Sequence, residues 1–312
     1  MGEANPRGAG NVARWTQREL DDPGLRFQSG CASVRERTEA HHDRGKRPAI
    51  GSASAAKAGT AAAQSAGRMW LQVVRTRLFE LSILLWSLPF GLAILSIFQV
   101  WRPPWLVRWA LRRWSAGFVG AARWIVGVEY RIEGRENVPR RPVIFVCNHQ
   151  SYWESIGFTV FEPNLNVVTK AEAMDIPVFG WGLRHAPMIP VQRDRRGTNL
   201  RRIIRDARKS LADGRSILLF PEGTRVAPGR FRRYERGVEA LYRTCDAEIV
   251  PVVHNAGLLW TSGFQTKHAG LVTLRFLPPI APGRDPGAVA AEIEDLLNRE
   301  KEHLAGHWRD ST

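Results

Sequence analysis

The chain has 312 residues, enough for one large domain or two small ones with a substantial core. Its formal net charge of +15 at pH 7 indicates an anionic partner, such as nucleic acid, a phospholipid surface or a phosphorylated substrate. Nucleic acid is not supported, because the sequence has no zinc-finger spacing, aromatic RNA-binding signature or basic zipper. Three scattered cysteines argue against a disulfide framework and fit a reducing compartment.

Residues 1–68 differ in composition from the rest of the chain. They are rich in Ala, Gly, Ser and Arg, contain seven acidic and eleven basic residues, and show no sustained hydrophobic period. Such a segment cannot bury enough apolar surface to offset its chain entropy, so we expect a disordered basic tail. Its acidic residues argue against a transit peptide. The tail is either a functional arm or lies outside a mature protein that begins near Met69.

Residues 78–100 form a mostly apolar stretch of 23 residues. As a helix, the stretch would be about 35 Å long, enough to cross a hydrocarbon core of ~30 Å. Glu80 lies near its start, where a charge can reach the membrane interface, and Pro89 near the middle would kink the helix. A spanning and a re-entrant helix are both compatible with this pattern, and a buried core helix is the alternative.

The segment 81–128 contains no acidic residue. It does contain five arginines and six tryptophans: Arg102, Arg108, Arg112, Arg113 and Arg123, with Trp86, Trp101, Trp105, Trp109, Trp114 and Trp124. Tryptophan and arginine together are typical of a bilayer interface, where the ring lies at headgroup depth and the cation contacts anionic lipid. We therefore predict that residues 69–126 form a membrane-anchoring helical hairpin.

After Gly127 the pattern changes to that of an α/β domain. Strands are expected at 128–132, 143–146, 216–220, 249–253 and 272–276. A helix should begin at Thr198 or Asn199 and close at Gly214, and another should occupy residues around 289–304. Because strands alternate with helices, we predict an α/β domain over 127–312, with a mixed, largely parallel sheet and flanking helices.

Residues 147–154 read Cys-Asn-His-Gln-Ser-Tyr-Trp-Glu, directly after an apolar strand-like run. The imidazole of His149 can take a proton from a substrate hydroxyl, while the carboxylate of Glu154 fixes its tautomer and stabilises the imidazolium. On one continuous helix the two side chains would point about 140° apart, so His149 must precede a helix whose first turn holds Glu154. Asn148 or Ser151 could cap that helix. The structural alternative is an ordinary loop histidine.

Three further segments follow in order: 176–181 (Ile-Pro-Val-Phe-Gly-Trp) with 188–194 (Met-Ile-Pro-Val-Gln-Arg-Asp), 220–225 (Phe-Pro-Glu-Gly-Thr-Arg) and 249–255 (Ile-Val-Pro-Val-Val-His-Asn). With the histidine segment, this set resembles the 1-acyl-sn-glycerol-3-phosphate acyltransferase family over about residues 128–280. The family motifs are Asn-His-x-Ser-x-x-(Asp/Glu), an apolar block ending in Arg, Glu-Gly-Thr-Arg, and Val-Pro-Val. The resemblance implies the glycerolipid acyltransferase fold, after an N-terminal membrane-embedded helical segment.

The match has two departures. The acid of the first motif is usually Asp in the family, whereas this chain has Glu154, which is one methylene longer. The second block usually has Gly and Phe where this chain has Pro187 and Pro190. The first departure bears on rate and geometry, and the second on the choice of acceptor or acyl chain.

The resemblance implies that a fatty acyl group moves from a thioester to a glycerol hydroxyl, with His149 as general base and Glu154 as its orienting partner. No Gly-x-Ser-x-Gly setting occurs, so the nucleophile is expected to be the substrate hydroxyl. The implied site for the substrate phosphate comprises Arg225, Glu222, Gly223, Thr224, Arg193 and Lys170. Arg225 is the leading candidate because guanidinium is a permanently charged, forked donor, and an ordinary surface charge is the alternative for each cation.

The expected product is phosphatidic acid from 1-acyl-sn-glycerol-3-phosphate. Acylation of another lysolipid, such as a lyso-aminolipid, is the alternative within the class, and a non-catalytic membrane lipid-binding protein is the alternative outside it. The expected partners are the phospholipid bilayer, the lysophospholipid acceptor and acyl-CoA or acyl carrier protein as thioester co-substrate, with no cofactor and no nucleic acid. We expect the inner or plasma membrane, with the active site on the cytoplasmic face.

No metal is expected, because the pairs His41/His42 and Glu235/Glu239 lack partners at metal-binding spacing. His254, after the Val-Pro-Val block, is assigned a structural role.

Overall fold

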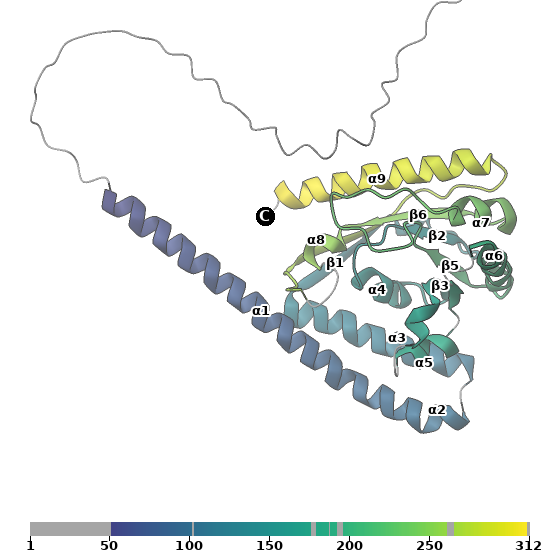
Figure 1. Cartoon of the computed structure of the whole chain (residues 1–312), viewed down its shortest axis with the longest axis horizontal. Coiled ribbons are helices and arrows are strands. Elements are labelled where there is room, and N and C mark those ends of the chain that lie inside the picture. Colours follow the sequence, from purple (N-terminus) through teal and green to yellow (C-terminus); the bar gives the residue numbers. More distant parts are fainter. Residues whose placement is uncertain are drawn as a thin grey trace, which may run out of the picture. The chain divides into compact units, whose positions relative to one another are not determined.

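The computed structural model describes residues 51–101, 103–175, 179–186, 188–191, 196–260 and 265–310. The chain separates into two units, Met1–Ala53 and Ser54–Thr312. The sheet, the helices that cover it and the candidate site all belong to the second unit (Figure 1).

The first helix, α1 (Gly51–Leu95), is longer than the sequence led us to expect. Its first turns occupy residues 51–68, for which we predicted disorder, so the structure differs from that prediction over this stretch. The composition explains the difference, because the stretch is rich in alanine, the strongest helix former, and continues into the apolar helix without a break. The rest of the expected tail, residues 1–50, lies outside the described residues.

Three elements follow α1: α2 (Ile97–Val100), α3 (Pro104–Ala121) and the π-helical turn Ala122–Val126. Indole groups join α1 to α3. The Nε1 of Trp114 donates to the Oγ of Ser87 at 2.9 Å, and that of Trp86 donates to the carbonyl of Trp114 at 3.1 Å. The rings of Phe79 and Phe118 meet edge to face at 5.4 Å. The tryptophans of the predicted interface therefore divide into some that join the two helices and others that point outward.

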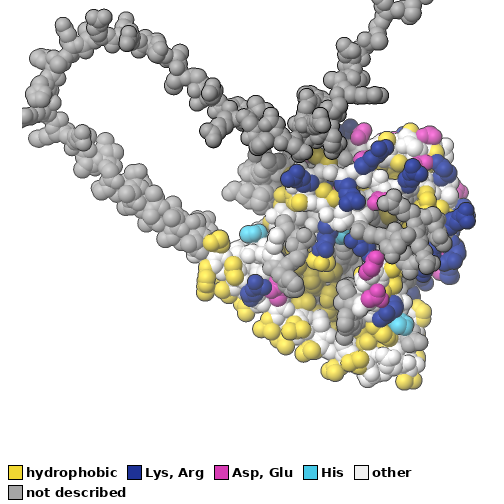
Figure 2. Space-filling view, viewed as in Figure 1, with side chains coloured by type: hydrophobic (Ala, Val, Ile, Leu, Met, Phe, Trp, Pro, Cys, Tyr) yellow, Lys and Arg dark blue, Asp and Glu magenta, His cyan; other side chains and the backbone are white. Residues whose placement is uncertain are grey.

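The outward-facing tryptophans belong to an exposed apolar surface on α1 and its neighbours. Among the described residues, Met69–Leu95 is the one helical segment long and apolar enough to cross a membrane, with a mean hydropathy of 1.9. Only 11% of its most apolar window is buried, far less than in a core helix. Figure 2 shows apolar side chains over these helices, and the large exposed ones include Leu81, Leu84, Leu85, Leu88, Leu92, Trp101, Trp105 and Trp109.

Glu80, the carboxylate near the start of the apolar stretch, forms ion pairs. Its carboxylate lies 3.0 Å from the Nζ of Lys267 and 2.7 Å from Arg77. Lys267 is almost fully buried and lies over the rings of Phe79 and Trp260. Because a buried ammonium needs such a partner, this contact fixes α1 to the segment before the last strand.

Within the described residues, seven strands form one sheet in the order β1-β7-β6-β2-β5-β3-β4. The strands are β1 (Val128–Glu133), β2 (Ile144–Cys147), β3 (Leu165–Lys170), β4 (Ile189–Val191), β5 (Ser216–Leu219), β6 (Ile249–His254) and β7 (Gly270–Phe276). All neighbours pair in parallel except β6 and β7. The predicted mixed, largely parallel sheet is confirmed, and the strands β3 and β4 were not predicted.

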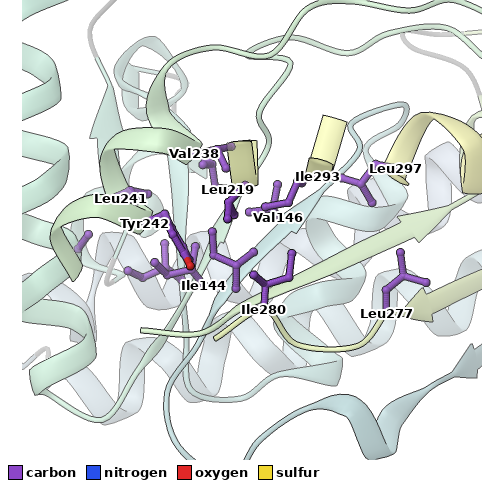
Figure 3. Packing of buried hydrophobic residues seen from close by; sticks show 14 of the residues in the cluster. Ile144, Val146, Leu219, Val238, Leu241, Tyr242, Leu277, Ile280, Ile293 and Leu297 are labelled. Atoms are coloured by element: carbon purple, nitrogen blue, oxygen red, sulfur yellow. The ribbon is translucent and has the colours of Figure 1, made fainter. Parts of the chain in front are cut away.

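Helices cover both faces of this sheet. The elements are α4 (Trp153–Phe161), α5 (Phe179–His185), α6 (Arg196–Ala212), α7 (Gly237–Cys245), α8 (Ala256–Leu259) and α9 (Pro286–Asp310). On one face Leu241 of α7 and Ile293 and Leu297 of α9 pack on Ile144 and Val146 of β2 (Figure 3). The opposite face is covered by apolar side chains of α3, α4 and α8.

Two predicted helix boundaries shift. The helix expected from Thr198 or Asn199 begins at Arg196 and is followed, as expected, by Gly214 in the left-handed region at φ 77°. The C-terminal helix starts at Pro286, which suits a first helical turn because its missing N–H would have no partner there, and it runs on to Asp310.

Candidate active site

Three neighbouring parallel strands, β5, β2 and β6, end at the same edge of the sheet. Val146 is in register with Leu219 of β5 and Pro251 of β6. The residues that follow these strands therefore meet, although they are far apart in sequence. Ligands of open α/β sheets bind at such carboxyl edges.

His149 and Glu154 are paired here. The Nδ1 of His149 lies 2.8 Å from the Oε1 of Glu154, and this oxygen also accepts the N–H of Gln150 at 2.9 Å and of Ser151 at 2.8 Å. Glu154 is fully buried in the first turn of α4, and His149 precedes the helix, as the spacing predicted. When Nδ1 donates to the carboxylate, Nε2 is left as an acceptor.

The surroundings of Glu154 favour its charged form. Burial raises the pKa of this carboxyl, but His254, His149 and the N–H of Ser151 outweigh burial and hold the pKa below its usual value. The His149 ring stacks on Phe220 at 4.2 Å and keeps a fifth of its side chain exposed. The pair thus joins a buried carboxylate to an imidazole that solvent or substrate can reach.

The two expected helix caps have different roles. Tyr152 and not Ser151 is the cap residue of α4, but the Oγ of Ser151 accepts the N–H of Trp153, the first helical residue, at 3.0 Å. Asn148 instead pairs with His254: its Nδ2 donates to the His254 carbonyl at 3.0 Å, and its Oδ1 accepts the His254 N–H at 3.0 Å. These bonds join the ends of β2 and β6 directly beside His149.

His254 is closer to the site than its assigned structural role suggested. Its Nδ1 accepts the N–H of Ala256 at 3.2 Å, so the ring proton is on Nε2, which donates to the Asn148 carbonyl at 2.7 Å. Burial lowers the pKa of His254, and the charge of Glu154 and the bond to the Asn148 carbonyl offset part of this effect. The same Nε2 lies 3.9 Å from the Oε1 of Glu154. The sequence did offer one indication that His254 lies near the site, because His254 is the last residue of a strand that was expected to be buried.

Glu222 also serves His149, from the end of β5. Its Oε2 accepts the backbone N–H of His149 at 2.6 Å, and its Oε1 lies 3.4 Å from the Nζ of Lys301 in α9. Burial raises the pKa of Glu222, and the His149 N–H and Lys301 offset part of that rise. The resemblance placed Glu222 in the site for the substrate phosphate, whereas its two carboxylate oxygens contact His149 and Lys301. No motif identified Lys301.

Arg225 lies on the other side of the same turn. Its guanidinium carbon is 3.9 Å from the centre of the Tyr152 ring, and its Nη1 is buried with no hydrogen-bond partner among the described residues. The N–H of Val226 donates to the His149 carbonyl at 2.8 Å, which fixes this segment beside the histidine. A buried guanidinium nitrogen with no protein acceptor is a donor available to an anionic ligand.

The remaining predicted site residues are distributed along this edge. Gly223 has φ 65°, a left-handed conformation that favours glycine, and Thr224 is half-buried beside it. Lys170 is the exposed last residue of β3, two strands from His149. Arg193 and Pro187 lie outside the described residues, and Pro190 is in β4.

A histidine–carboxylate pair at the carboxyl edge of a largely parallel sheet is suited to an enzyme that removes a proton from a hydroxyl. A family model described as Acyltransferase matches residues 129–255 of this chain. The 1-acyl-sn-glycerol-3-phosphate acyltransferase of Pseudomonas aeruginosa is 31% identical over 223 residues, covering 70% of this chain and 86% of the relative. That of Chlamydomonas reinhardtii is 30% identical over 155 residues, covering 47% and 46%.

The crystal structure of the 1-acyl-sn-glycerophosphate (LPA) acyltransferase PlsC from Thermotoga maritima has the same fold, with a TM-score of 0.61 and 23% identity over 76% of this chain and 98% of that one. The chain belongs to the 1-acyl-sn-glycerol-3-phosphate acyltransferase family, as the four motifs indicated.

Proposed function

We propose that the protein transfers a fatty acyl group from a thioester to the free hydroxyl of 1-acyl-sn-glycerol-3-phosphate and so makes phosphatidic acid. The observation that carries this proposal is the His149–Glu154 pair, whose Nδ1 and Oε1 are 2.8 Å apart, together with a buried guanidinium nitrogen of Arg225 that has no partner among the described residues. The relatives named above are called acyltransferases for this same acceptor.

In the proposed reaction, the Nε2 of His149 takes the proton from the acceptor hydroxyl as its oxygen attacks the thioester carbonyl carbon. The carbon–sulfur bond then breaks, and the leaving thiolate receives the proton from the imidazolium. Glu154 stabilises the imidazolium between these two transfers, which a carboxylate with its pKa held low is suited to do. The thioester is already activated, so base catalysis and positioning are the main demands on the chain.

The phosphate of the acceptor is proposed to bind Arg225. The Tyr152 ring covers one face of the guanidinium, which leaves the in-plane N–H groups to reach phosphate oxygens. The left-handed turn at Gly223 and the adjacent Thr224 would bring backbone close to the same oxygens. Lys170 and Arg193 are proposed as further cations for this group, and Glu222 as a support for His149.

Residues 69–126 are proposed to attach the protein to the inner or plasma membrane, with the site on the cytoplasmic face. The support is the exposed apolar surface of α1 together with Trp101, Trp105 and Trp109. Attachment would bring the site to the bilayer surface, where an amphiphilic acceptor gathers. Acyl-CoA and acyl carrier protein are both retained as thioester donors.

The function is tested with the purified full-length protein in phospholipid vesicles. The acceptors are lysophosphatidate, lysophosphatidylethanolamine, a lyso-aminolipid and monoacylglycerol, each with acyl-CoA and with acyl carrier protein thioester. Lysophosphatidate should give the highest kcat/KM, and His149→Ala should abolish the reaction. A higher kcat/KM for another lysolipid would mean that this lysolipid is the acceptor, while the proposed acyl transfer would still stand. No transfer from either donor to any acceptor would contradict the proposal.

Membrane attachment predicts the behaviour of a fusion. Residues 69–126 joined to a soluble reporter should bring it into the membrane fraction and keep it there in high salt, because an apolar contact is not screened. A matched fusion with Leu84, Leu88 and Leu92 changed to Gln should return to the soluble fraction. Recovery of the unaltered fusion in the soluble fraction would contradict this attachment.

A further inference from the structure

Lys301 is a buried cation outside the segment that the family model matches. It lies in α9, beyond residues 129–255, and its side chain is 5% exposed. Its Nζ is 3.4 Å from the Oε1 of Glu222 and 5.1 Å from the centre of the Phe231 ring. An ammonium that loses water at such a place must be compensated by its partners. The buried ammonium of Lys301 therefore depends on its contact with the Glu222 carboxylate at the active-site edge.

Packing of α9 brings Lys301 to that edge. Ile293 and Leu297 lie four residues apart on the helix face that packs on the sheet (Figure 3). Lys301 is four residues further along the same face, so its side chain is directed inward by the same periodicity. Lys301 thus interrupts an otherwise apolar helix face between Leu297 and the buried Leu304, and it does so beside Glu222.

Glu222 contacts both Lys301 and His149, through its two carboxylate oxygens. The oxygen of Glu222 that does not face Lys301 accepts the His149 N–H at 2.6 Å, while the His149 carbonyl accepts the N–H of Val226 at 2.8 Å. Both backbone polar groups of His149 are therefore held by the segment 222–226. The position of this backbone decides where the imidazole lies against Glu154.

We propose that Lys301 is a positioning residue for catalysis: its ammonium orients the Glu222 carboxylate, which in turn holds the backbone of His149 in the geometry that base catalysis requires. This makes the C-terminal helix part of the active-site scaffold. The inference rests on the proposed role of His149 as the general base. Lys301 itself touches neither the acceptor nor the thioester in this arrangement.

The arrangement predicts a dependence on pH. Burial raises the pKa of Glu222, while the His149 N–H and Lys301 lower it. The titratable groups that face Glu222 are His149 and Cys147 from the end of β2, Lys301 from α9 and Tyr234 from the segment before α7. Without the Lys301 ammonium, one of the two groups that lower the pKa of Glu222 is lost. The pKa of Glu222 then rises further, and the carboxyl takes up a proton at a higher pH. The acid limb of activity then moves to higher pH.

The test compares Lys301→Met, Lys301→Arg, Glu222→Gln and the double variant Lys301→Met/Glu222→Gln in the full chain, with exposed Arg299→Met on the same helix as control. Steady-state kcat and KM for lysophosphatidate are measured from pH 5 to 9, together with melting temperature. Lys301→Met should lose ~10–100-fold in kcat at neutral pH through misplacement of the base, with little change in KM. Part of the loss should be regained at high pH, and Lys301→Arg should retain most activity.

The double variant decides between positioning and a merely structural contact. If Lys301 acts through Glu222, adding Lys301→Met to Glu222→Gln should cost little further activity. If Lys301→Met folds poorly because it leaves a buried carboxylate without its cation, the double variant should recover the melting temperature.

The proposal is overturned if Lys301→Met keeps the rate and pH profile of the unaltered enzyme, or if its loss is independent of pH and equally large in the Glu222→Gln background. An unaltered enzyme that acylates lysophosphatidate in the same assay leaves the proposed function standing in either case. An unaltered enzyme inactive in the whole lysolipid panel contradicts the function. Recovery of the melting temperature in the double variant then still tests the Lys301–Glu222 contact.

Discussion

Glu154→Gln should reduce the initial rate of acyl transfer by up to ~10⁴-fold, the size of loss known for the analogous change in a serine-protease triad. The amide cannot stabilise the imidazolium, and an amide nitrogen turned toward Nδ1 would donate a hydrogen bond and impose the wrong tautomer on His149. Glu154→Asp keeps the charge but shortens the reach, so a smaller loss of ~10–100-fold is expected. The measurement is the initial rate at saturating donor.

His149→Ala should be at least as damaging as Glu154→Gln, and the double variant should be little worse than His149→Ala alone, because the two side chains act as a unit. Glu162→Gln is a matched control, since Glu162 follows the same helix α4 and pairs with Arg135 away from the histidine. A fully active Glu154→Gln enzyme would show that the carboxylate has no part in catalysis and would reopen the whole assignment.

Arg225→Ala should lower kcat/KM for lysophosphatidate by ~10²–10³-fold, as expected when two charge-assisted hydrogen bonds to phosphate are lost. Acylation of monoacylglycerol, which has no phosphate, should change little. Arg225→Lys should give an intermediate loss, because it keeps the charge but has neither the planar fork nor the stacking on Tyr152. The comparison of the two acceptors is the measurement that isolates the phosphate contact.

Arg230→Ala is the control for this series, since Arg230 is exposed in the same segment after β5. It should leave both acceptors unaffected. An equal loss of activity on both acceptors in Arg225→Ala would mean that Arg225 supports the fold of the turn and does not bind phosphate.

The sequence alone determined the features that lie within one short segment. His149 and Glu154 are five residues apart, so the need for a loop and a first helical turn could be worked out from helix geometry, and the structure has this arrangement. Apolar runs predicted the strands β2, β5 and β6, because a strand buried on both faces leaves a continuous apolar pattern. Strand β1 was predicted from alternating residues, and β7 was also expected. The four ordered motifs indicated the family, because each of them is also a short, continuous segment.

Only the tertiary structure decided which strands are neighbours and which distant side chains meet between them. Asn148 and His254 are 106 residues apart, and Glu222 and Lys301 are 79 apart. Hydrophobic periodicity shows which face of an element is buried, but not what lies opposite that face. Lys301 looks like any other lysine of a charged C-terminal helix, and its proposed role depends on its contact with Glu222 at the end of β5. The sequence therefore determined the His149–Glu154 pair, and the packing of β2, β5, β6 and α9 determined the buried hydrogen bonds that hold it.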